Sequence, residues 1–215
     1  MINVLDKGFV KLVDFMGSDV NIVNAARISY DKRVDAISEK DVKLLDYLWE
    51  NKHTSPFRHA TIQFHIKAPI FIFRQWQKHQ VGCAWNEKSA RYTRFDVECY
   101  RPSVFRLQHK KNKQSSYGNV EDNESALKTY DHVINTAINA YYELLASGVC
   151  KEQARMILPQ NMYTECYWTA SLQAAMHFLE LREDEHSQWE MQQYAKATRV
   201  LMKPLFKNAM AKCTK

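Results

Sequence analysis

The polar side chains between residues 86 and 92 are the stretch of this chain that most clearly could do chemistry. Glu87, Ser89 and Arg91 alternate along it. In an extended segment alternate side chains point to one side, so an acceptor, a hydroxyl and a guanidinium would stand together. Such a row suits a small phosphorylated molecule with hydroxyl groups, because a guanidinium forms paired hydrogen bonds with phosphate. A solvated turn with a surface ion pair is the alternative for these residues alone.

The apolar segment before this row predicts a buried helix that ends beside a pocket. Pro69 is suited to the first position of a helix, and Ile70, Phe73 and Trp76 follow at helical spacing. Polar side chains gather where the helix is expected to end: Arg74, Gln75, Lys78 and His79. Cations are favoured at a helix C-terminus by the helix dipole, so a structural role is also available. A polar row that follows within one loop favours a binding site.

Together, the two segments resemble the motif of the flavin-dependent thymidylate synthases, in which Arg-His-Arg and a short spacer precede Asn-Glu-x-Ser-x-Arg-Tyr. This chain has Lys78-His79-Gln80 and then Asn86-Glu87-x-Ser89-x-Arg91-Tyr92. Further blocks resemble the family in the same order along nearly the whole chain: His53-Thr54-Ser55-Pro56-Phe57, Ala154-Arg155-x-x-Leu158-Pro159, Tyr163-Thr164 to Trp168-Thr169, Leu181-Arg182 and His186-x-Gln188.

The departures from the family pattern fall mainly on its flavin contacts. Lys78 and Gln80 stand where the motif usually has arginines, and the spacer before Asn86 is one residue longer. Ser171-Leu172-Gln173 stands where members often have Asn-x-Arg. Fewer arginine forks are then available, so we expect FAD to bind but to be lost readily.

The resemblance implies a site for the nucleotide dUMP. The residues that would contact it are Gln75, Glu87, Ser89, Arg91, Arg155 and Arg182. Arg182, Ser89 and His53 are the implied catalytic residues. An arginine beside the uracil carbonyls can stabilise charge that develops on the ring, whereas Ser89 is expected chiefly as a phosphate ligand.

The resemblance also implies a flavin site, with Ser29 and Ser55 near the flavin phosphates. The full set of implied cofactor contacts is Ser29, Ser55, Lys78, His79, Gln80, Ser171, Gln173 and His177. His53 would face flavin or folate together with the segment 78–80. No metal site is predicted.

The implied reaction is the reductive methylation of dUMP to dTMP. 5,10-Methylenetetrahydrofolate would donate the carbon, FAD would carry hydride, and NADPH would be the reductant. The cysteines agree with this, because none has Pro before it and His after it, the pattern of the thiolate nucleophile in conventional thymidylate synthases. Cys83 is interpreted as a small apolar filler. Two alternatives stay open: a hydroxymethylase acting on dUMP or dCMP, and a non-catalytic nucleotide-binding homologue.

Composition sets the outer limits. A chain of 215 residues predicts a single catalytic domain over 1–215, and no apolar run is long enough for a membrane helix. The five cysteines include no CxxC pair, which predicts reduced thiols in the cytoplasm, or in the host cytoplasm for a viral protein. The net charge of +6 is explained by anionic substrates, so nucleic-acid binding at Lys110, Lys111 and Lys113 is less favoured. Family members imply a homotetramer with shared sites.

The patterning predicts an α/β fold of the α+β kind, and the resemblance implies a mixed, mostly antiparallel sheet flanked by long helices. Alternating residues predict strands over 9–15, 60–67 and 162–169. Caps and helical spacing predict helices over 18–29, 38–49, 124–147, 152–157, 170–182 and 186–202, besides the one from Pro69. The segment 102–123 is polar and aperiodic, which predicts a flexible loop.

Overall fold

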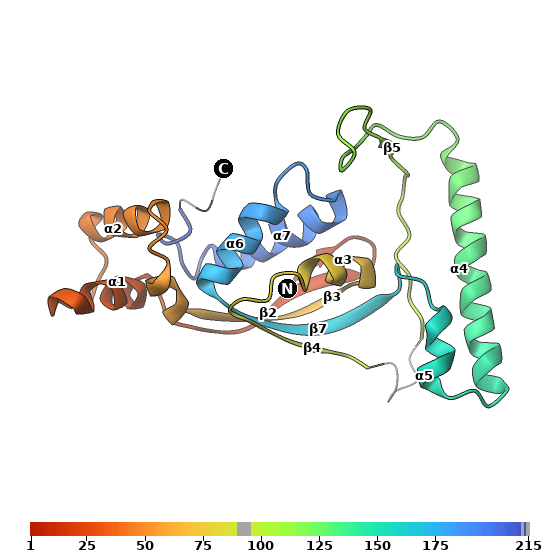
Figure 1. The fold of residues 1–215 in the computed structure, drawn as a ribbon, viewed down its shortest axis with the longest axis horizontal. Helices are drawn as coiled ribbons and strands as arrows, with labels where there is room; N and C mark the ends of the chain where they lie inside the picture. Colours follow the sequence, from red (N-terminus) through yellow and green to blue (C-terminus); the bar gives the residue numbers. More distant parts are fainter. Residues whose placement is uncertain (90–95, 212, 214–215) are drawn as a thin grey trace.

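The computed structural model describes residues 1–89, 96–211 and 213, and its centre is a five-stranded sheet of order β1-β2-β3-β7-β4 (Figure 1). All neighbouring strands run antiparallel, which confirms the expected sheet. The strands are β1 Ile2–Val4, β2 Gly8–Met16, β3 Thr61–Pro69, β4 Cys83–Glu87 and β7 Tyr163–Ser171. Arg91 lies outside the described residues.

The middle strands β3 and β7 follow from the alternation of apolar and polar residues. Ile62, Phe64 and Ile66 are buried on one face, where Phe64 lies opposite Trp168. Both strands run slightly past their predicted C-terminal ends. Residues 170 and 171 were predicted as helix but belong to β7, because they complete its pairing with β3 and β4.

Helices α3 Ile70–Trp76, α6 Leu172–Arg182 and α7 Trp189–Met202 cover one face of the sheet (Figure 1). Pro69 was predicted as the first helical residue, which is wrong: it is the last residue of β3 and the N-cap of α3. The backbone N–H of Ile70 donates to the Met162 carbonyl at 2.9 Å, so the chain is still attached to the sheet there.

A helical lobe covers the β2 and β3 ends nearest α1. It contains α1 Asp19–Arg27, the 3-10 turn η1 Ile28–Tyr30, α2 Glu39–Glu50 and η2 Ser55–His59. Arg27 Nη2 lies 2.5 Å from Asp41 Oδ1 and joins α1 to α2. Hydrogen bonds from Ser38, and then Arg27, lower the pKa of Asp41, so this carboxylate is stabilised in its charged form.

At the opposite end, the long helix α4 Asn123–Ala146 stands away from the sheet beside α5 Lys151–Ala154 and η3 Arg155–Ile157 (Figure 1). A small apolar cluster around Cys99, Ile134 and Met162 connects it to the body. The segment 102–123 contains a short hairpin, β5 Leu107–Gln108 and β6 Ser116–Tyr117, which its sequence did not predict; its flexibility stays a prediction. Within the described residues, no helix is long and apolar enough to cross a bilayer.

Candidate active site

The C-terminal end of α6 brings Arg182 against the turn that follows α3. Arg182 Nε donates to His79 Nε2 at 2.9 Å, and Arg182 Nη2 donates to the Gln75 backbone carbonyl at 3.3 Å. We call Arg182, His79 and Gln75 the arginine cluster. These two bonds hold one edge of the guanidinium. Within the described part of the chain its other N–H groups have no hydrogen bond, so they can reach a ligand.

Trp76 explains why this cluster forms. It is fully buried and stacks on Phe178 of α6, with ring centroids 4.5 Å apart and planes 10° apart. Gln75 precedes Trp76 directly, and the backbone N–H of His79 donates to the Trp76 carbonyl at 3.0 Å. The stacked pair therefore fixes α3 against α6 and places Gln75 and His79 along one edge of the Arg182 guanidinium.

Burial gives the two titratable members of the cluster different charge states. It lowers the pKa of His79 to about 4, helped by the positive charge of Arg182 and by His177, whose ring lies 6.1 Å away. Burial also lowers the pKa of Arg182, but the ordinary pKa of an arginine is so far above neutral that the side chain keeps its charge near neutral pH. His79 is then neutral and accepts the Arg182 hydrogen bond.

The turn after α3 also lies against the start of α6. Gly82 has φ +73°, and a Cβ atom there would come within 2.8 Å of Ser171 Oγ, so glycine is needed for this close approach. Ser171 is the N-cap of α6 and accepts from the Ala174 N–H at 3.2 Å. Most of the predicted flavin contacts lie on these two adjoining segments: Lys78, His79 and Gln80 on the turn after α3, and Ser171, Gln173 and His177 at the N-cap of α6 or within it.

The two other predicted flavin contacts, Ser29 and Ser55, and the predicted catalytic residue His53 lie in the helical lobe. Ser29 is exposed on η1, Ser55 begins η2, and His53 meets Tyr47 edge to face at 6.1 Å. Among the described residues, no hydrogen bond or ring contact joins these three side chains to the arginine cluster. The lobe nevertheless touches the start of α6, where the Leu172 N–H donates to the Ala60 carbonyl at 2.8 Å.

The predicted phosphate row is built separately. Glu87 is the last residue of β4 and is exposed, and Ser89 follows beyond the strand. Of the residues in this row, β4 therefore includes Glu87 and ends before Ser89. A cavity of about 300 Å³ lies beside Glu87. Arg155 is exposed on η3 at the α4 end of the molecule. The structure therefore places Gln75 and Arg182 together, and Glu87, Ser89 and Arg155 apart from them.

Sequence reasoning missed a buried acid next to the arginine cluster. Glu190, only 4% exposed, accepts from Arg106 Nη2 at 2.7 Å and from Gln188 Nε2 at 3.0 Å. Gln188 in turn accepts from Gln75 Nε2 at 2.6 Å. The sequence does contain one signal of this buried acid: Glu190 stands between the apolar residues Trp189 and Met191, near the start of the helix predicted over 186–202.

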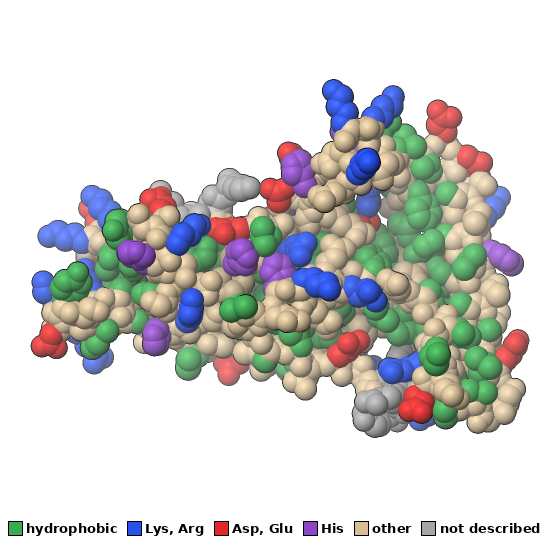
Figure 2. Space-filling view, in the orientation of Figure 1, with side chains coloured by type: hydrophobic (Ala, Val, Ile, Leu, Met, Phe, Trp, Pro, Cys, Tyr) green, Lys and Arg blue, Asp and Glu red, His purple; other side chains and the backbone are tan. Residues whose placement is uncertain are grey.

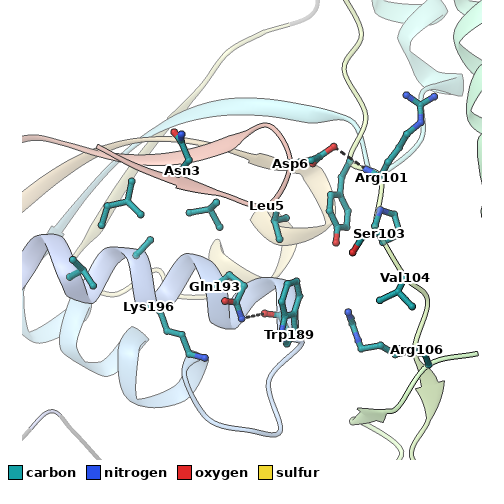
Figure 3. Close-up of a pocket in the computed structure, with 17 residues that line it drawn as sticks. Asn3, Leu5, Asp6, Arg101, Ser103, Val104, Arg106, Trp189, Gln193 and Lys196 are labelled. Carbon is teal, nitrogen blue, oxygen red and sulfur yellow. Dashed lines mark hydrogen bonds between the residues drawn. The ribbon is translucent and has the colours of Figure 1, made fainter.

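The cavities lie beside this acid. One cavity, of about 840 Å³, lies between β1, α7 and the segment 100–106, and none of the predicted site residues that the structure describes lines it (Figure 3). Gln188 lines two smaller cavities of about 610 and 490 Å³. Histidine and basic side chains gather in the middle of the face seen in Figure 2. The described residues contain no group of three or more His, Cys, Asp or Glu side chains placed to hold a metal ion.

Comparison with known proteins identifies the family. A family model described as thymidylate synthase complementing protein matches residues 11–206. A flavin-dependent thymidylate synthase of Thermus thermophilus is 48% identical over 202 residues, covering 94% of this chain and 74% of that protein. One from Kosmotoga olearia is 46% identical over 204 residues, covering 94% and 88%.

A solved structure agrees. The UMP/dUMP methylase PolB of Streptomyces cacaoi, bound with 5-Br dUMP, superposes with a TM-score of 0.85 and 30% identity. The match covers 97% of this chain and 95% of that one. The resemblance seen in the motifs therefore extends to sequence and fold along nearly the whole chain, and this chain belongs to the thymidylate synthase complementing protein family, that of the flavin-dependent thymidylate synthases.

Proposed function

We propose that this protein is a methyltransferase that converts dUMP to dTMP, with FAD as cofactor, 5,10-methylenetetrahydrofolate as carbon donor and NADPH as reductant. The observation that carries the proposal is the arginine cluster. Methylation at C5 of uracil requires negative charge to build up on the ring. Arg182, held by His79 and the Gln75 carbonyl, is a fixed cation that can stabilise this charge next to a carbonyl oxygen.

The thiols support a route without a cysteine nucleophile. Burial raises the pKa of Cys83, Cys99 and Cys166, so these side chains are poor sources of thiolate near neutral pH. A bound reduced flavin supplies hydride instead. All five cysteines are unpaired, which supports a reducing compartment such as the cytoplasm.

The residues around the start of α6 fit a flavin nucleotide. Lys78 and Gln80 offer a cation and amide donors on the turn that leads to Gly82, which lies against Ser171, and Gln173 lies in the first turn of the 11-residue helix α6. A helix N-terminus favours the negative charge of phosphates. We propose that this group, with His79, His177 and Ser171, holds FAD. Ser29, Ser55 and His53 would complete the site from the helical lobe. Lys78 and Gln80 bind phosphate less firmly than arginine forks, so FAD should be lost easily.

We propose that Ser89 and Arg91 hold the dUMP phosphate, that Glu87 and Gln75 lie against the nucleotide, and that Arg155 comes from another subunit of a homotetramer. The uncovered face of the sheet supports this assembly. Phe9, His65 and Tyr167 form a row of rings there, with neighbouring centroids 5.1 and 5.0 Å apart. Tyr167 is 45% exposed, and such a row is suited to packing against a second copy.

The test is an anaerobic assay of purified protein with dUMP, 5,10-methylenetetrahydrofolate, FAD and NADPH, with the nucleotide product identified by mass. dTMP would support the proposal. A hydroxymethylated nucleotide would support the hydroxymethylase alternative, and no product from a protein that binds dUMP would support the non-catalytic one. FAD titration by fluorescence quenching in the presence of dUMP tests the cofactor. No binding at concentrations of FAD well above the protein would contradict it.

A further inference from the structure

A chain of side-chain hydrogen bonds leads from a buried carboxylate to Gln75. The Gln75 amide donates to Gln188 Oε1 at 2.6 Å, and the Gln188 amide donates to Glu190 Oε2 at 3.0 Å. The other carboxylate oxygen, Glu190 Oε1, accepts from Arg106 Nη2 at 2.7 Å. We call Arg106, Glu190, Gln188 and Gln75 the amide relay.

The chemistry of the groups sets the direction of this relay. A carboxylate paired with an arginine accepts hydrogen bonds and cannot donate them. Gln188 must therefore turn its amino group toward Glu190 and its oxygen toward Gln75, which must give its own amino group. The reverse direction would place two oxygens against each other. Gln75 Oε1 is left as an acceptor, and it has no hydrogen bond within the part of the chain that the structure describes.

Glu190, the carboxylate at which the relay starts, is held in place by several contacts. Glu190 lies in the first turn of α7, where the helix dipole favours an acid, and the Tyr100 hydroxyl approaches it at 3.4 Å. The Arg106 guanidinium lies over the Trp189 ring, 5.3 Å from its centroid, and reaches it from the segment opposite α7 (Figure 3). Removing one partner of a buried ion pair is costly, so the carboxylate keeps its place.

The free end of the relay adjoins Arg182. Arg182 Nη2 donates to the backbone carbonyl of Gln75, so the residue that carries the free acceptor Oε1 is also the one that contacts the guanidinium. Gln188 also lines cavities of about 610 and 490 Å³, which are of the size that ligand pockets have. A donor next to an acceptor matches a carbonyl next to an N–H on a flat ring.

We propose that Glu190 and Gln188 are positioning residues that make the site select uracil over cytosine, by holding Gln75 Oε1 as an acceptor beside Arg182. This inference rests on the proposed function and adds the origin of its base specificity. Uracil presents a carbonyl and the N3–H to this pair. Cytosine in the same position presents a bare nitrogen at position 3, so its lone pair faces the Gln75 oxygen. A polar site rejects a ligand that leaves its groups unmatched.

The experiment compares the affinities of the FAD-loaded protein for dUMP and dCMP by calorimetry. We expect wild type to prefer dUMP by about 100-fold or more. Gln188→Leu cuts the relay at an exposed residue, and Glu190→Gln removes the fixed acceptor at its origin. Each should reduce the dUMP/dCMP ratio about tenfold, the scale of one hydrogen bond. Gln193→Leu is the matched control, because Gln193 is on the same helix but donates to the Trp189 carbonyl.

The ratio separates positioning from a general structural defect, because both ligands share deoxyribose and phosphate. A defect in folding or assembly would weaken both alike. An unchanged ratio in folded Gln188→Leu and Glu190→Gln, with tight dUMP binding, would overturn the relay but leave the proposed function intact. Wild type that binds neither nucleotide would overturn both.

Discussion

The arginine cluster and the phosphate row differ in how the chain builds them. In the cluster, Arg182 is held by His79 and Gln75 across two packed helices. In the phosphate row, β4 ends at Glu87, before Ser89. Arg155, the other residue proposed near the nucleotide, is exposed on a separate turn. One chain thus preorganises the group proposed to act on the base, while the described residues Ser89 and Arg155, proposed to hold the phosphate, stand apart from it. This difference is the reason for proposing that a complete site requires assembly, and the following changes test that proposal.

The largest effect is expected at the cluster itself. Arg182→Ala should reduce dTMP formation about 100-fold or more, the scale for removing one preorganised charge stabiliser. The rate is measured anaerobically with saturating dUMP. Arg33→Ala serves as the control, because the Arg33 side chain is 83% exposed and lies 4.0 Å from Asp35, outside the arginine cluster. Near-normal turnover in Arg182→Ala would remove the cluster from catalysis.

The phosphate row should show its effect in binding. Arg91→Ala is expected to weaken dUMP binding by about 1.5–3 kcal/mol, the range for a lost charged hydrogen bond. Calorimetry measures the affinity, and a circular dichroism spectrum checks the fold. If the folded variant binds dUMP as tightly as wild type, Arg91 is not a phosphate ligand.

Mixing two variants tests whether the Arg182 and the Arg155 that serve one active site come from different chains. Arg182→Ala and Arg155→Ala, each inactive alone, should regain activity when unfolded together and reassembled, because some sites then combine two intact residues. The matched control mixes Arg182→Ala with Gln75→Leu. Both of these changes fall in one cluster, so no site can be repaired. Equal outcomes in the two mixtures would contradict shared sites.

A smaller effect concerns pH. Burial lowers the pKa of His79 to about 4 from an ordinary 6.5, so between these values the unfolded chain binds a proton that the folded chain does not. Stability should therefore fall as pH drops from 6.5 toward 4, and His79→Gln should lessen this fall. The His79 ring signal in NMR should titrate near pH 4; a midpoint near 6.5 would show that Arg182 does not depend on a neutral histidine.

The smallest effect is expected at Cys83, which lies between the two regions at the start of β4. The side chain is half-buried, and burial raises the pKa of its thiol. Cys83→Ala should keep most of the activity, because losing one small side chain costs at most about 1 kcal/mol. An inactive but folded variant, with a fluorinated dUMP trapped only when Cys83 is present, would instead indicate thiolate catalysis.

Much of the fold was predictable because its signals are local. Alternation at Ile62, Phe64 and Ile66 predicted β3, and Ser38 with Asp41 predicted the start of α2, where the capping box is present. The short strand β1 was missed because three residues are too few to show a period. Pro69 was misplaced because its φ of −61° suits both a helix start and the extended residue before one.

The sequence by itself determined which chemical groups the chain carries, the order of its motifs and the family to which they point. Only the tertiary structure decided which groups meet. Arg182 binds His79 across 103 residues, and Glu190 binds Arg106 across 84. Local patterns report neighbours within a few residues, whereas these contacts depend on how α3, α6 and α7 pack around Trp76. The amide relay could therefore not be read from the spacing of its members, since its direction depends on a carboxylate that packing buries.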